Sequence, residues 1–325
     1  MTAIRRLNHD QGWRKRPDAL GVHSIDHFAL EVPDLKAAED FYGKFGLNVT
    51  EDGGNLHLTA DGSDHRWGSM TEGNRKQLHH VSFNCFEEDL EPLKRRAERH
   101  GVKLLDPPKG FESNSIWFHD QDGNLVEIKP GPKTSPNEKL HGQWTSSAPA
   151  TRGSPYRRHA DAVRPHRLAH LLFFTPDVDK AINFYSKVIG LRLSDRSQDI
   201  IAFMHGVHGS DHHLIAFAKS SHKGFHHASW DVDTVGEVGL GAMRMAEGGY
   251  AKGWGLGRHV LGSNYFHYVQ DPWGSFSEYS CDIDYIPSDV DWEAGDHDPE
   301  DSLYIWGPDV PKIFTTNFET PTPRD

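Results

Sequence analysis

The sequence predicts an α+β fold of two homologous domains, each built from paired β-α-β-β-β modules that form a curved, mostly antiparallel sheet. The first observation is a repeated stretch, HFALEVPDLKAAEDFYGKFGL at 27–47 and HLLFFTPDVDKAINFYSKVIGL at 170–191. Each copy has an apolar run, a Pro-Asp helix entry with the proline near the first turn, an amphipathic segment and a terminating glycine. The second observation is a repeated turn followed by a strand that carries a glutamate, at 118–131 and 268–281. The period of about 145 residues is too long for a solenoid repeat and indicates two domains.

The chain length agrees with this division, because 325 residues correspond to about two domains at roughly 150 residues each. We place an N-terminal domain at 20–135, a linker at 136–165, a C-terminal domain at 166–285 and a tail at 286–325. The linker is rich in Ser, Pro, Thr and Arg. In the tail we expect the acidic run to be solvated and Tyr304 and Trp306 to dock on the protein.

The remaining elements follow the same order in both halves. A strand begins at each His-His pair, and a second helix follows at 86–101 and at 232–249. The glycine cluster GWGLG at 253–257 lacks the preceding strand and following helix of a dinucleotide fingerprint, so we expect a flexible loop at the mouth of a site.

Composition narrows the class of protein. The chain has 47 acidic and 35 basic residues and a net charge of -12, whereas nucleic-acid binders usually present a basic face. No apolar run approaches the roughly 18 residues of a membrane span, and the first residues lack the apolar core of a secretory signal. With only Cys85 and Cys281, a disulfide framework is not expected. The sequence therefore predicts a cytoplasmic protein.

The chain has 23 histidines, and some of them recur in a pattern. Ser-Asp-His is followed seventeen residues later by the second member of a His-His pair, from 63 to 80 and from 210 to 227. In the second copy His170, His227 and Glu278 lie on three predicted strands, and two imidazoles with one carboxylate form the facial triad of non-haem iron sites. Because side chains alternate along a strand, only one of His226 and His227 should face the interior. The alternative is that these are hydrogen-bonded structural histidines and a solvent-facing glutamate.

The C-terminal copy resembles the type I extradiol ring-cleavage dioxygenases, the catechol 2,3-dioxygenase-like members of the vicinal oxygen chelate (glyoxalase–bleomycin resistance–dioxygenase) superfamily. AHLLFFTPDVDKAINFYSKVIGL, SDHHLIAFAK, GFHHASWDV and GRHVLGSNYFHYVQDPWGSFSEY carry the resemblance in this order. It implies the vicinal oxygen chelate fold and the metal ligands His170, His227 and Glu278. It also implies that His213 is the acid–base residue and that His259 and Tyr268 bind and orient substrate. The first members of the pairs, His212 and His226, should face away.

The resemblance implies a non-haem Fe(II)-dependent dioxygenase of aromatic-compound degradation, which opens a catechol ring beside its hydroxyls and incorporates both atoms of O2. Fe(II) is expected rather than Mn(II), although the same ligands suit both. The implied partners are a catechol and O2, with no nucleic acid or membrane, and relatives commonly form homo-oligomers. Two alternatives on the same fold are a glyoxalase-type metal isomerase and a metal-free small-molecule-binding protein of the resistance type. The sequence does not identify the catechol.

The N-terminal copy keeps the three ligand types and changes their surroundings. His27, His80 and Glu127 occupy the ligand positions, although the family usually lacks a working metal site there. The acid–base, tyrosine and histidine positions hold Arg66, Trp117 and Pro108. We therefore expect a non-catalytic domain, in which the three residues are either hydrogen-bonded remnants or the ligands of a second metal ion.

Overall fold

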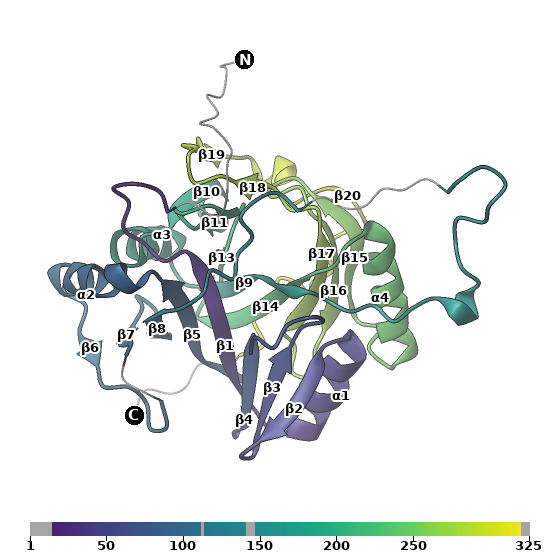
Figure 1. The fold of residues 1–325 in the computed structure, drawn as a ribbon, viewed down its shortest axis with the longest axis horizontal. Coiled ribbons are helices and arrows are strands. Elements are labelled where there is room, and N and C mark those ends of the chain that lie inside the picture. The colour runs from purple at the N-terminus through teal and green to yellow at the C-terminus, as the bar shows by residue number, and fades with distance from the viewer. Residues whose placement is uncertain (1–14, 112–113, 141–146, 320–325) are drawn as a thin grey trace.

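The computed structural model describes residues 15–111, 114–140 and 147–319, and it contains two large sheets (Figure 1). The strands of the first sheet are β1 (Ser24–Val32), β2 (Asn48–Asp52), β3 (Asn55–Thr59), β4 (Gly68–Glu72), β5 (Gln77–Cys85), β6 (Leu104–Leu105), β7 (Ile116–His119) and β8 (Leu125–Pro130). Their spatial order is β2-β3-β4-β1-β5-β8-β7-β6.

The second sheet comes from the C-terminal half. Its strands are β9 (Arg167–Thr175), β10 (Arg192–Ser197), β11 (Ile201–His205), β13 (Ile215–Lys219), β14 (Gly224–Asp231), β15 (Gly253–His259), β16 (Tyr265–Gln270), β17 (Phe276–Cys281), β19 (Gly295–Asp296) and β20 (Tyr304–Trp306). Their order is β19-β10-β11-β13-β9-β14-β17-β16-β15-β20. A separate small pair joins β12 (Ser210–Asp211) to β18 (Tyr285–Ile286).

The two sheets repeat one topology, which confirms the predicted fold class. In each half the first strand lies parallel to the fourth, as in β1 with β4 and β9 with β13. The strand of the His-His pair lies antiparallel to the first strand and parallel to the last, as in β14 with β9 and β17. Each half therefore consists of two β-α-β-β-β modules joined along their central strands.

Four α-helices occur in the described residues: α1 (Leu35–Phe45), α2 (Leu90–Arg99), α3 (Val178–Phe184) and α4 (Val235–Glu247). Shorter turns are η1 (Glu87–Asp89), η2 (Arg157–His159), η4 (Pro299–Asp301) and the π-helical turn η3 (Tyr185–Ile189), which continues α3. Helix α2 with η1 occupies the segment predicted at 86–101, and α4 that predicted at 232–249. None of these helices is long and apolar enough to cross a membrane.

The predicted helix boundaries have clear physical causes. Asp34 caps α1 by accepting hydrogen bonds from backbone N–H groups of its first turn, and Asp177 caps α3 in the same way. The aspartate is thus the cap, and the proline before it lies just outside the helix rather than in its first turn. Gly46 and Gly190 end the two segments at φ 102° and 87°, a region that glycine enters without steric cost.

The two halves share one apolar core. Phe45 at the end of α1 stacks on Tyr279 of β17 with ring centroids 3.9 Å apart, and the Tyr279 hydroxyl donates to the Phe45 carbonyl at 2.7 Å. Phe28 of β1 stacks on Phe225 of β14 at 5.5 Å. These buried aromatic contacts join the sheets, so the halves form one packed body. The domain boundaries proposed from the sequence stay a prediction.

The tail is part of the second sheet. Strand β19 pairs with β10, and β20 pairs with β15, where Tyr304 lies opposite His259. Trp306 lies on the same strand and is 45% exposed. The glycine cluster at 253–257 lies within β15, so the prediction of a flexible loop was wrong. Glycine is needed at Gly257 because a Cβ there would lie 2.9 Å from the Trp306 carbonyl oxygen of the neighbouring strand.

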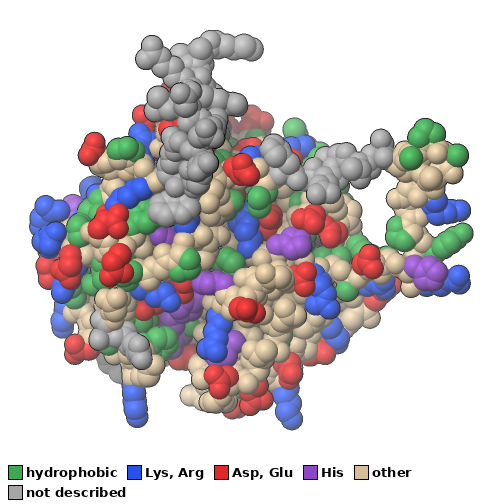
Figure 2. Space-filling view, viewed as in Figure 1, with side chains coloured by type: hydrophobic (Ala, Val, Ile, Leu, Met, Phe, Trp, Pro, Cys, Tyr) green, Lys and Arg blue, Asp and Glu red, His purple; other side chains and the backbone are tan. Residues whose placement is uncertain are grey.

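Charged side chains are mixed on the surface. On the face shown in Figure 2, acidic and basic side chains are interspersed over both halves and form no single basic stripe.

Candidate metal centre

Three neighbouring strands bring His170, His227 and Glu278 together. His170 lies on β9, His227 on β14 and Glu278 on β17, and Ser229 of β14 is the register partner of both His170 and Glu278. His170 Nε2 lies 3.1 Å and His227 Nε2 lies 3.6 Å from Glu278 Oε2. One ligand atom from each side chain lies within 4.8 Å of the other two. The spacing singled out in the sequence thus produces a compact cluster of two imidazoles and a carboxylate.

The chemistry of this cluster fits a divalent metal ion. All three side chains are buried, and neither His227 Nε2 nor Glu278 Oε2 has a hydrogen-bond partner among the described residues. Burial lowers the pKa of His227, which keeps the imidazole neutral, the form that binds a metal. Although burial alone would raise the pKa of Glu278, the His170 imidazole beside the carboxylate lowers it. A buried carboxylate beside unpartnered nitrogen and oxygen atoms is costly unless a cation binds there.

The adjacent His226 does not simply face away, as strand alternation had predicted. The pairing of β14 with β9 shifts register between Phe225 and His227, so His226 is the extra residue of a β-bulge. Its Nδ1 lies 2.7 Å from His227 Nδ1, and its Nε2 lies 2.6 Å from the carbonyl oxygen of Phe314. The bulge lets both imidazoles reach the same region. His226 links the candidate ligand to the tail.

His213 lies beside the cluster at the end of a chain of polar groups. Its ring centroid is 4.0 Å from that of His170, and its Nδ1 is 3.1 Å from Nδ1 of His212. His212 points the other way, toward Asp195 Oδ2 at 2.8 Å, as expected for a structural residue. Burial lowers the pKa of His213 well below its ordinary value, so this imidazole is neutral near pH 7.

His259 and Tyr268 form a second buried pair at the same place. The Tyr268 hydroxyl lies 2.9 Å from His259 Nε2, and His259 Nδ1 lies 2.6 Å from the carbonyl oxygen of Leu303. A carbonyl only accepts, so Nδ1 carries the proton and Nε2 accepts from the tyrosine. Burial raises the pKa of Tyr268, so the phenol stays protonated. Tyr268 lies directly opposite Glu278 in the sheet.

A cavity of about 310 Å³ adjoins the cluster. All candidate residues except the buried Glu278 line it, and much of the rest of its wall is apolar. The tail contributes Pro299, Ser302, Leu303, Phe314 and Thr315. The tail therefore closes one side of the candidate site, a role that the sequence did not predict.

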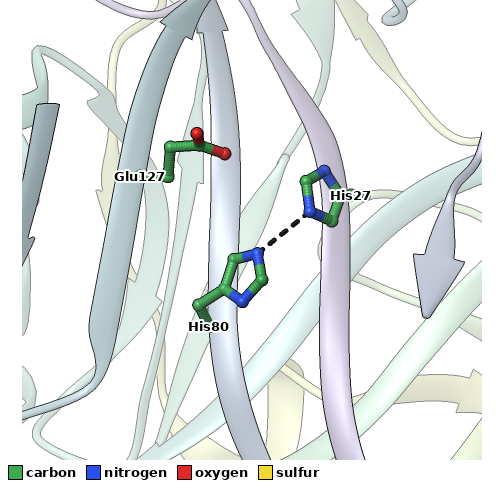
Figure 3. A group of neighbouring side chains, drawn as sticks. All are labelled: His27, His80 and Glu127. Atoms are coloured by element: carbon green, nitrogen blue, oxygen red, sulfur yellow. Dashed lines mark hydrogen bonds between the residues drawn. The ribbon is translucent and has the colours of Figure 1, made fainter. Parts of the chain in front are cut away.

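The N-terminal copy holds a cluster of the same design (Figure 3). His27 on β1, His80 on β5 and Glu127 on β8 point toward one another, and Ser82 is the register partner of both His27 and Glu127. Nε2 of His27 lies 3.0 Å from Nε2 of His80. A ligand atom from each of the three residues lies within 4.8 Å of the others.

The surroundings of this second cluster differ from those of the C-terminal cluster, as the sequence predicted. The side chain of Arg66, at the position of His213, is 63% exposed and lies 3.8 Å from Asp52. It therefore points to solvent and not into the cluster. Trp117 lies opposite Glu127, as Tyr268 does opposite Glu278. Pro108 lies outside the strands of its sheet.

Several neighbours of the C-terminal cluster were missed by sequence reasoning. The Asn264 amide donates to Glu278 Oε1 at 3.1 Å and to Ser280 Oγ at 2.9 Å, and it is buried. The only sequence signal for Asn264 is that it lies within GRHVLGSNYFHYVQDPWGSFSEY, one of the stretches that carry the family resemblance. His205 and His208 are also buried, and burial lowers their pKa values to about 3 and about 4.

Comparison with known proteins agrees with this geometry. Residues 24–128 and 167–279 match the family described as Glyoxalase/Bleomycin resistance protein/Dioxygenase superfamily. The chain is 53% identical over 299 residues to Metapyrocatechase 2 of Cupriavidus necator, which covers 92% of this chain and 93% of the relative. It is 23% identical to the Manganese-dependent 2,3-dihydroxybiphenyl 1,2-dioxygenase of Geobacillus genomosp. 3, over 89% of this chain and 95% of the relative.

Solved structures show the same fold. The Mn(II)-bound glyoxalase from Novosphingobium aromaticivorans superposes with a TM-score of 0.73 at 23% identity and covers 94% of this chain and 95% of its own. The 2,3-dioxygenase LapB from Pseudomonas sp. KL28 gives a TM-score of 0.68 at 20% identity and covers 85% of this chain and 98% of its own. The two family matches, one per half, and the 53% identity over nearly the whole chain confirm the resemblance seen in the sequence. The chain belongs to the Glyoxalase/Bleomycin resistance protein/Dioxygenase superfamily.

Proposed function

We propose that this protein is an extradiol dioxygenase, which uses a metal ion and O2 to open a catechol ring beside its two hydroxyls. The observation that carries the proposal is the buried trio of His170, His227 and Glu278 beside a cavity of about 310 Å³. The 53% identity to a protein named Metapyrocatechase 2 supports the same reaction. Extradiol dioxygenases are metal-dependent, and the trio supplies the ligand types of a facial triad.

The metal ion in this proposal is Fe(II), held by His170, His227 and Glu278. When bound, it would act as a Lewis acid, bring catechol and O2 together and let electrons pass between them. Mn(II) suits the same ligands. Metal analysis of protein purified without added metal distinguishes the two ions.

His213 is the group proposed to move protons. It lines the cavity, and its Nδ1 faces His212, which is held in turn by Asp195. This arrangement leaves Nε2 as the atom that can take a proton from the substrate and return it later. Because burial lowers the pKa of His213, the imidazole is neutral and ready to act as a base at neutral pH.

His259 and Tyr268 are proposed to orient the substrate. The carbonyl of Leu303 fixes the His259 ring, and the hydrogen bond between the two side chains fixes the Tyr268 hydroxyl. Both groups line the cavity, where the Tyr268 hydroxyl can turn its one proton from His259 to a substrate oxygen as charge develops on that oxygen.

The wall of the cavity favours catechols with uncharged, apolar substituents. Its apolar residues include Leu172, Phe174, Phe203, Leu261 and Phe314. Lys219 is the one lysine or arginine among the lining residues; it is 44% exposed and lies 3.6 Å from Asp199. A substituent carboxylate would lose its hydration in this cavity without a buried cation to replace it. Alkyl- or aryl-substituted catechols should therefore be better substrates than acid-bearing ones.

Oxygen uptake tests the proposal. The protein is purified without oxygen, loaded with Fe(II), and given catechol, methylcatechols, a dihydroxybiphenyl and an acid-bearing catechol. We expect one O2 consumed per ring opened, both atoms of labelled O2 in a hydroxymuconic semialdehyde-type product, and the lowest kcat/KM for the acid. A glyoxalase-type isomerase would consume no O2, and a metal-free binding protein would hold catechol without iron.

A further inference from the structure

We propose that the N-terminal copy binds a second divalent transition-metal ion, at His27, His80 and Glu127, and that this ion is structural. The proposal does not depend on ring cleavage, because it concerns a separate cluster in the other sheet. The sequence left two possibilities open for these residues, hydrogen-bonded remnants or ligands of a second metal ion, and we propose the second.

The distance between the two imidazole nitrogens of the cluster suits a shared metal ion. Two ligand atoms that each lie about 2.1 Å from a metal, at octahedral to tetrahedral angles, are separated by about 3.0 to 3.4 Å. Nε2 of His27 and Nε2 of His80 are 3.0 Å apart, and an oxygen of Glu127 completes the group within 4.8 Å. Figure 3 shows the three side chains converging from adjacent strands. In the C-terminal copy the two imidazole nitrogens lie 3.1 and 3.6 Å from the glutamate oxygen, which is a similar spacing of ligand atoms.

Asp26 gives His27 the orientation typical of a metal ligand. A bulge in β1 places Asp26 beside His27, and its Oδ2 lies 2.6 Å from His27 Nδ1. Lys129 and Asn84 hold the carboxylate at 2.7 and 2.8 Å. A carboxylate on one ring nitrogen fixes the tautomer and leaves the other nitrogen free for a metal. In the C-terminal copy this position is Ala169, and His170 Nδ1 has no hydrogen-bond partner among the described residues.

The other two ligands are oriented by their own neighbours. Nδ1 of His80 lies 2.7 Å from Nδ1 of His79, which leaves Nε2 to face His27. Ser82 Oγ donates to Glu127 Oε2 at 2.5 Å, so Oε1 remains for a further partner. His80 and Glu127 are buried in the sheet. Each histidine therefore has one ring nitrogen held by the protein and the other directed into the cluster, and Glu127 has one oxygen held by Ser82.

The surroundings suit a structural ion rather than a catalytic one. The Phe111 and Trp117 rings pack on His80, each with its centroid 5.1 Å from that of the imidazole. Arg66 points to solvent, so no acid–base group replaces His213. An ion here would join β1, β5 and β8, the three central strands of the first sheet. Among Mn²⁺, Fe²⁺ and Zn²⁺, sites of this type bind Zn²⁺ most tightly, so Zn²⁺ is the probe.

Zinc titration of metal-free full-length protein, followed by dialysis and elemental analysis, tests the site. Wild type should retain two Zn²⁺ per chain, whereas His80→Ala and Glu127→Gln should each retain one. His119→Ala, which removes an exposed histidine from the same sheet, should retain two. Zn²⁺ should also raise the Tm of His227→Ala, which keeps only the N-terminal site, and not that of His80→Ala/His227→Ala. Glu127→Gln keeps the shape of the side chain and covers the case in which His80→Ala does not fold.

Asp26→Asn separates metal binding from packing. Loss of the carboxylate should weaken Zn²⁺ at the N-terminal site by roughly 10–100-fold, the usual effect of removing such a partner. The C-terminal affinity should not change, a difference that a merely structural role for Asp26 would not produce. One ion per chain in folded wild type, with the same count in Glu127→Gln, would overturn the proposal and leave a metal-free hydrogen bond between His27 and His80.

Discussion

His213 and His212 are neighbours in the chain, yet only His213 lines the cavity beside the candidate ligands. His213→Asn keeps a side chain that can hydrogen-bond but cannot take a proton. We expect full metal content and catechol binding, with turnover lowered by roughly the 10²–10⁴-fold of general acid–base catalysis. Elemental analysis and oxygen uptake measure the two effects, with His119→Asn as a surface control. Loss of metal from His213→Asn would instead make His213 a ligand.

At the scale of residues, the sequence predicted ligand types but not their neighbours. The repeat placed His170, His227 and Glu278 on equivalent strands of a known pattern, and the structure brings them together. Asn264 and Asp26 could not be predicted in this way. The contacts of Asn264 depend on strand pairing and those of Asp26 on a bulge, and a local sequence pattern predicts neither. The roles of the individual residues stay predictions.

The tail is the element whose function is most directly testable. Phe314 is buried against Trp254 and Tyr268, with ring centroids 4.6 Å from each, and lines the cavity. Phe314→Ala should destabilise the protein by about 3–5 kcal/mol, as for other buried phenylalanines. It should also raise KM for apolar catechols more than it lowers kcat, because it removes a wall and not a reacting group. Denaturant unfolding and steady-state kinetics measure these effects.

Phe318→Ala is the matched control for the tail, since Phe318 is exposed. It should leave KM for apolar catechols within a few-fold of wild type. If both variants raised KM equally, the tail would act through its general packing and not through the Phe314 wall.

At the scale of elements, the sequence predicted strands and helices where the repeat supplied two copies to compare. It did not predict β19 and β20, because they are short and have no counterpart in the first half. It also predicted a loop where β15 lies, because a glycine-rich segment is typical of a loop when its partner strands are unknown. These glycines lie in a strand because β16 and β20 pair with β15 on its two sides.

For the whole molecule, buried neutral histidines predict a stability that depends on pH. Burial lowers the pKa of His23 and His205 to about 3, and that of His208 and His267 to about 4. The unfolded chain binds protons at these positions below about pH 6.5, whereas the native protein does not. The free energy of unfolding should therefore fall as pH drops from 6.5 toward 4, by up to about 1.4 kcal/mol per pH unit for each histidine.

Denaturant unfolding between pH 4 and 8 checks this slope. His205→Gln should reduce it, because one proton fewer is then taken up on unfolding. A free energy of unfolding that stays level or rises on acidification would contradict the neutral assignment.

We propose that ring cleavage takes place at the C-terminal cluster and not at its N-terminal counterpart. The most direct measurement is oxygen uptake with a methylcatechol, together with iron per chain, in His227→Ala and His80→Ala after the same anaerobic loading. We predict that His227→Ala loses the C-terminal iron and its ring cleavage falls to background. His80→Ala should keep ring cleavage, with any loss explained by lower stability. Full iron and turnover in His227→Ala, or loss of turnover in a folded His80→Ala that retains its C-terminal iron, would contradict the account.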